Sequence, residues 1–98
     1  MSLAQPKDYA VEAEEGRTAE SLLEDPLLKR AFEEVEKTIV DRWKESRTGD
    51  VEEQTHLRLM LSALKNVESA LIGFIKTGSV AERYLKRERR GLLGLIRR

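Results

Sequence analysis

The chain has 98 residues, of which 37% are charged and 40% hydrophobic, and it contains two prolines and no cysteine. This length allows one domain with a small core, and abundant Leu, Glu, Arg, Lys and Ala favour helices over strands. The lack of cysteine excludes disulfides, thiolate nucleophiles and the commonest structural zinc sites, which fits an intracellular protein. No apolar run is long enough to cross a bilayer, and the acidic N-terminal region lacks the apolar stretch of a secretory signal.

The net charge of zero conceals a gradient along the chain. Residues 1–36 hold ten acidic and four basic side chains, whereas residues 83–98 hold seven basic side chains and one acidic side chain. Such polarity suits an acidic arm, a basic tail for nucleic acid or another anionic surface, or head-to-tail contact between copies.

Residues 1–24 are predicted to form an acidic flexible arm. Over residues 1–17, proline, glycine and scattered acids follow no periodicity, which is typical of a segment that is disordered or ordered by a partner. A short helix is expected over residues 18–24, where two leucines would dock on the rest of the chain.

Residues 25–78 are predicted to form an antiparallel helical hairpin. Its first helix starts at Asp25-Pro26, an N-cap followed by proline at the first helical position. That helix is expected to end near Ser46, because the next four residues have turn chemistry. The second helix is expected over residues 51–77, with Gly78 as the left-handed residue that closes it.

The two helices of the predicted hairpin carry apolar stripes that pair with a nearly constant index sum. The pairs are Leu28 with Leu71, Phe32 with Val67, Val35 with Leu64, Ile39 with Met60, and Trp43 with Leu57. The turn position and both stripes agree, which favours the hairpin more than either stripe alone. We expect Trp43 to pack at the end of the hairpin, and an exposed binding hot spot is the alternative.

The second helix also carries apolar residues outside the stripe that faces the first. They are Leu59, Ala63, Ala70 and Phe74, with Gly73 on their flank. Two helices cannot bury so wide an apolar surface, and a core this small is marginal alone. We therefore expect a homo-oligomer whose interface contains these five residues, with glycine permitting close approach.

Residues 79–98 are predicted to form a third, basic and amphipathic helix opened by a capping box of Ser79 and Glu82. Its cations are Arg83, Lys86, Arg87, Arg89, Arg90, Arg97 and Arg98. They could neutralise the phosphates of nucleic acid or lie at a membrane interface, the latter being the less favoured. The third interpretation is a solvated helix whose last leucines dock on a neighbouring subunit. Tyr84 is the one aromatic residue here, which weakens a stacking platform for single strands.

The sequence offers no arrangement of catalytic residues, so we expect neither an enzyme nor a cofactor. There is one histidine, no cysteine, no nucleophile elbow and no glycine-rich phosphate loop. Glu53 and His56 form a Glu-x-x-His unit, the spacing that places two ligands on one face in di-metal bundles. A structural role is favoured, because Glu53 also suits a capping box with Asp50. A dimeric di-metal, ferritin-like protein is kept as an alternative.

Four stretches between Pro26 and Gly78 carry a family resemblance. They are Ala31-Phe32-Glu33-Glu34-Val35-Glu36, Asp41-Arg42-Trp43, Gly49-Asp50 followed by Glu52-Glu53, and the helix from Leu57 that ends in Thr77-Gly78. In this half of its length the chain resembles small uncharacterised helical-hairpin proteins of tailed bacteriophages and prophages, encoded near portal, capsid or packaging genes.

The resemblance implies a bacteriophage protein of the host cytoplasm or the virion. Its role would be virion assembly, through protein-protein interaction with phage structural or packaging proteins. The arginine-rich tail lies outside the resembling segment, so its partner is not implied. From the residues alone, a nucleic-acid-binding accessory of DNA packaging is the alternative function.

Overall fold

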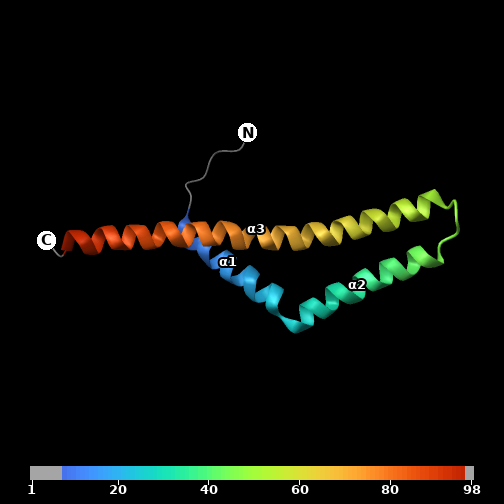
Figure 1. Cartoon of the computed structure of the whole chain (residues 1–98), viewed down its shortest axis with the longest axis horizontal. Helices are drawn as coiled ribbons and strands as arrows, with labels where there is room; N and C mark the ends of the chain where they lie inside the picture. Colours follow the sequence, from blue (N-terminus) through green and yellow to red (C-terminus); the bar gives the residue numbers. More distant parts are fainter. Residues whose placement is uncertain (1–7, 97–98) are drawn as a thin grey trace.

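The computed structural model describes the backbone of residues 8–96 and the side chains of residues 8–94. It contains three helices, α1 (Tyr9–Glu24), α2 (Pro26–Glu45) and α3 (Val51–Ile96), and no strand within the described residues. Figure 1 shows α3 as one long rod, with α1 and α2 on one side of it. The all-α prediction is confirmed, but the three helices are not the three that were expected.

Helix α1 corrects the prediction of a flexible N-terminal arm, because residues 9–17 are helical and continue into the expected short helix. Asp8 is the N-cap, and its Oδ1 accepts hydrogen bonds from the backbone N–H groups of Ala10 at 3.1 Å and Val11 at 3.2 Å. The residues that this helix buries are small and do not form a leucine stripe. They are Ala13, Gly16 and Ala19. For this reason the segment shows no obvious apolar periodicity.

Asp25 separates α1 from α2 and caps both helices. Its backbone N–H donates to the carbonyl of Leu22 at 3.2 Å, and its side chain accepts from the N–H of Leu28 at 2.9 Å. Because Pro26 follows, Asp25 is held in an extended conformation and the helix cannot run on. The predicted start of the hairpin at Asp25-Pro26 is confirmed.

The turn between α2 and α3 also lies where the sequence predicted it. Helix α2 ends at Glu45 with Ser46 as its C-cap, and Gly49 has a φ of 92°, a conformation that side chains disfavour. Asp50 accepts a hydrogen bond from the N–H of Glu53 at 3.1 Å, which is half of the expected capping box.

Helix α3 corrects the predicted boundary at residue 78. It runs without interruption for 46 residues, so Gly78 is not a left-handed terminator and Ser79 does not open a new helix. The predicted basic third helix is therefore the last part of α3. Glu82, the expected partner in a capping box, instead faces α1 and pairs with Arg17.

The molecule is a flat triangular frame rather than a globule. In Figure 1, α1 starts against α3 and runs away from it, and α2 then comes back toward α3 and meets it at the turn. Helices α2 and α3 are antiparallel there, and they diverge with distance from the turn. The principal dimensions are 75 × 38 × 13 Å, so the frame is about one helix thick. Its radius of gyration is 20.8 Å, against about 13 Å for a compact chain of 100 residues.

Among the residues whose side chains are described, the buried apolar ones lie in two small regions. Near the turn, Ile39 of α2 and Leu57 of α3 are buried. Ion pairs cross the same two helices, from Arg42 to Glu53 at 3.0 Å and from Lys65 to Glu36 at 3.6 Å. The second region is where α1 crosses α3, and its buried residues are Ala13, Ala19 and Ala81.

The predicted pairing of the two apolar stripes holds only near the turn. Val35 and Val67 were expected to be core residues but are 47% and 51% exposed. The reason is the divergence of α2 from α3, which leads α2 away to its junction with α1 (Figure 1). An apolar stripe reports which face is to be buried, but not how far along the helix a partner covers it.

Candidate interaction surfaces

The closest approach of two helices lies where Gly16 of α1 meets Gly78 of α3. A Cβ atom added at Gly16 would lie 2.9 Å from the Cα of Gly78, and one added at Gly78 would lie 2.8 Å from the Cα of Gly16. These distances leave no space for a side chain, so glycine is required on both helices. Sequence reasoning missed this crossing. Its signal was small residues three apart on each segment, Ala13-x-x-Gly16-x-x-Ala19 and Gly78-x-x-Ala81.

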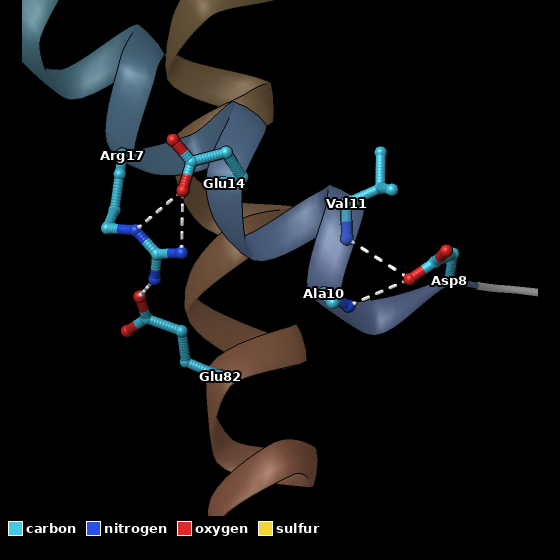
Figure 2. Close-up of polar contacts among 6 residues, drawn as sticks. All are labelled: Asp8, Ala10, Val11, Glu14, Arg17 and Glu82. Atoms are coloured by element: carbon cyan, nitrogen blue, oxygen red, sulfur yellow. Dashed lines mark hydrogen bonds and ion pairs between the residues drawn. The ribbon is translucent and has the colours of Figure 1, made fainter.

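At the solvent-exposed edge of this crossing, Arg17 of α1 forms ion pairs with two glutamates. Figure 2 shows its guanidinium between Glu14 of the same helix and Glu82 of α3. The shortest N···O distances are 2.8 Å to Glu14 and 2.6 Å to Glu82. The hydrogen bonds to Glu14 and Glu82 raise the pKa of Arg17, so the side chain stays charged at every physiological pH. All three side chains are exposed to solvent, so salt will screen these pairs.

Two tyrosines stack at the N-terminal end of α1. The ring centroids of Tyr9 and Tyr84 are 4.9 Å apart with an interplanar angle of 15°, and the guanidinium of Arg87 lies 5.7 Å from the Tyr84 centroid. Together with the glycine crossing, this contact fixes where α1 meets α3. The Tyr84 ring is thereby engaged within the chain by Tyr9 and Arg87.

The five residues predicted to form an oligomer interface are all on α3 and all exposed. Leu59 is 63% exposed and Phe74 47%, and a Cβ added at Gly73 would meet no atom within 4 Å. Ala63 and Ala70 lie between them at spacings of four and seven residues, which puts this set on one helix face. No contact within the protomer uses Gly73, so the predicted close approach there stays a prediction.

An apolar groove of about 590 Å³ opens beside this face, between α1 and α3. Its apolar lining comes from both helices: Val11, Ala19, Leu22, Leu71 and Phe74. Phe74 is shared by the groove and by the predicted interface. The predicted interface on α3 therefore continues onto α1, which the sequence did not indicate because the arm was expected to be flexible.

Trp43 is neither fully packed nor free. Its side chain is 40% exposed and lines an apolar hollow with Ile39 and Leu57 at the turn end of α2 and α3. Its expected neighbour, Leu57, is completely buried. The location at the hairpin end agrees with the sequence, and part of the ring remains available to solvent.

The described cations of the predicted basic tail lie on the last part of α3, beside and beyond the residues that contact α1. Arg83, Lys86, Arg87, Arg89 and Arg90 are exposed, and within the described residues none has an acidic side chain within 4 Å. Figure 1 shows this end of α3 extending past the start of α1, with no other described helix beside it. Arg97 and Arg98 lie outside the described residues.

Glu53 and His56, the candidate metal ligands, lie on the first turns of α3 and line one hollow with Asp50 and Glu52. Glu53 Oε1 is engaged by Arg42 at 3.0 Å. Within the described residues, no three side chains of histidine, aspartate or glutamate are grouped closely enough to hold a metal ion. The geometry of one protomer thus gives Glu53 a role in joining α2 to α3.

These features define a class: an all-helical, three-helix chain in which α1 packs on a long α3. No helix in the described part of the chain is long and apolar enough to cross a membrane. Comparison with protein-family models, with curated proteins and with solved structures gives no match.

Proposed function

We propose that the protein is a non-enzymatic assembly protein that self-associates through α3 and the neighbouring groove, and that contacts a partner with the basic end of α3. The observation that carries this proposal is the small core. Within the described residues, the buried apolar side chains are three alanines, Ile39 and Leu57. A flat frame with so little buried apolar surface gains stability when copies cover its exposed face.

The exposed apolar face is the best candidate for that contact. Leu59 and Phe74 project from the same side of α3, and the groove with Val11 and Leu22 adjoins them. Exposed apolar residues that lie together on one face are a usual mark of an interaction site. Along the sequence the net charge changes from acidic over residues 1–36 to basic over residues 83–98, and this difference would orient the copies as they meet.

We place this role in a bacteriophage particle or packaging complex, on the resemblance of residues 26–78 to phage helical-hairpin proteins. Its partners would then be phage structural or packaging proteins, in the host cytoplasm or in the virion. The assembly mechanism does not depend on this placement, because it follows from the exposed apolar face of the chain itself.

The test is the molar mass in solution, measured by light scattering after size exclusion. We expect a defined oligomer for the natural chain and a smaller species for a Leu59→Glu, Phe74→Glu variant, because a buried carboxylate without a partner is costly. The matched control is Leu27→Glu with Val51→Glu, which changes two apolar residues that are more exposed and lie off the proposed face. A folded monomer at all concentrations, or equal loss in both variants, would refute the proposal.

A further inference from the structure

The basic end of α3 carries its cations as an ordered stripe. Arg83, Lys86, Arg87 and Arg90 follow one another at spacings of three, one and three residues within an unbroken helix. At about 100° per residue, these four side chains occupy an arc of about 100° and span about 10 Å along the helix. Such a stripe requires residues 83–90 to be helical, and in the structure this segment is part of α3.

Within the described residues, no acidic side chain pairs with the cations of this stripe. Glu82 is engaged by Arg17 at 2.6 Å, and Glu88 lies on another side of the helix, about 150° from the centre of the stripe. The face of α3 that packs against α1, marked by Ala81 and Leu85, is about 160° away. The four cations are therefore exposed, and a second copy packed on the apolar face of α3 would leave them exposed.

We propose that this stripe binds the phosphate backbone of double-stranded nucleic acid, which supplies the partner of the basic contact arm in the function proposed above. Four unpaired cations in a row match a polyanion with a regular charge spacing, and binding of this kind is electrostatic and independent of sequence. Among the described residues, no other helix lies beside this end of α3, so a duplex can approach it without displacing one (Figure 1).

A single-stranded nucleic acid fits this surface less well than a duplex. Single strands are held by aromatic side chains on which bases stack. The aromatic residue of this region is Tyr84. Its ring already stacks on that of Tyr9 and makes a cation–π contact with the guanidinium of Arg87. The cations can therefore contact only the phosphate backbone of the nucleic acid, and a duplex has more phosphates per unit length than a single strand.

A membrane surface is the competing partner for a basic helix, and it fits less well. Interfacial helices bury a broad apolar face rich in large side chains. The large apolar residues at this end, Leu92, Leu93, Leu95 and Ile96, follow the four cations in the sequence instead of alternating with them, and Gly91 and Gly94 interrupt the segment. Vesicle binding is therefore an outcome that the experiment must be able to reveal.

The experiment measures binding of the full chain to a fluorescein-labelled DNA duplex of mixed sequence, by anisotropy at several salt concentrations. Four phosphate contacts give a slope of log K against log salt of about −3.6 for each protomer bound. Replacing all four cations with glutamine (Arg83→Gln, Lys86→Gln, Arg87→Gln, Arg90→Gln) is expected to remove most of the affinity and flatten the slope. Glutamine preserves helix propensity, and circular dichroism checks that the variant is folded.

The matched control removes four exposed cations elsewhere on the chain, Lys29→Gln, Lys44→Gln, Arg47→Gln and Arg58→Gln. It lowers the net charge equally and should leave duplex affinity within a few fold. Equal loss in both variants would show that net charge, and not the stripe, attracts DNA, and would overturn the proposal.

Two further probes distinguish the competing partners. The same sequence as a single strand should bind more weakly, and tighter binding than the duplex would overturn the choice of double-stranded nucleic acid. Vesicles of phosphatidylglycerol and phosphatidylcholine should not bind at a salt concentration where the duplex does; binding to vesicles without binding to DNA would also overturn it. The molar mass of the natural chain is measured separately, so failure of DNA binding is distinguishable from failure of self-association.

Discussion

At the scale of single residues, two glycines determine how closely α1 packs on α3. Gly16 and Gly78 let the backbones of α1 and α3 touch, whereas Gly73 and Gly91 face open space. Glycine within a helix normally costs about 1 kcal/mol relative to alanine. The same substitution should therefore have opposite effects at the two kinds of position.

We predict that Gly78→Ala destabilises the chain, on the order of 1 to 3 kcal/mol, because the added methyl must push the helices apart. Gly16→Ala should behave alike. Gly91→Ala, outside the proposed oligomer interface, should instead raise the free energy of unfolding by about 0.5 to 1 kcal/mol. Urea unfolding followed by circular dichroism measures all three variants at one protein concentration. Stabilisation by Gly78→Ala equal to that of Gly91→Ala would mean that α1 does not pack here.

At the scale of helices, the sequence predicted the elements whose signals are local and missed those whose signals are distant. Asp25-Pro26 and the turn around Gly49 were predicted correctly, because capping and turn chemistry involve neighbours in the chain. Thr77-Gly78-Ser79 resembles the end of one helix and the start of another. It is helical here because Gly16, 62 residues away, packs against it, and tertiary contact outweighs local propensity.

The candidate surfaces divide in the same way. The basic tail and the exposed α3 face could be named from residue types, since charge and hydrophobicity are visible in the sequence. The groove with Val11 and Leu22 could not, because it exists only once α1 is helical and docked. The stripe from Arg83 to Arg90, by contrast, follows from the helix that the sequence predicted for residues 79–98, and the structure adds that this segment continues α3.

The continuity of α3 predicts a specific distance. The chain has no cysteine, so spin labels can be introduced at Ser62→Cys and Glu88→Cys without interference. An unbroken helix separates these positions by about 39 Å along its axis, from a rise of about 1.5 Å per residue. Pulsed electron paramagnetic resonance, with labelled protein diluted into unlabelled protein, should give one narrow distance of about this size.

A control pair for this measurement, Ser62→Cys with Lys76→Cys, lies before residue 78 and should give about 21 Å by the same rise. If the chain bends at Gly78, the long distance will shorten or broaden while the control distance is unchanged. That pattern would restore the two separate helices that the sequence predicted.

At the scale of the whole molecule, shape and surface lead to the same inference. A frame about one helix thick has two broad sides, and most of its large apolar residues are at least partly exposed on them. The buried regions at the turn and at the crossing are small and lie at different places along α3. Folding of one copy alone would thus leave much apolar surface in water, and association would remove it.

This coupling of folding to association predicts a midpoint of thermal unfolding, Tm, that depends on protein concentration. When only the folded state associates, mass action stabilises it as concentration rises. A hundredfold increase should raise Tm by several degrees, on the order of 5 °C for a chain of this length. Calorimetry or circular dichroism at two concentrations measures the shift. The Leu59→Glu, Phe74→Glu variant should unfold at a lower and nearly constant temperature, whereas Leu27→Glu with Val51→Glu should keep the dependence. A natural chain with a high Tm at both concentrations would show that one copy is stable by itself, and the exposed face would then need another explanation.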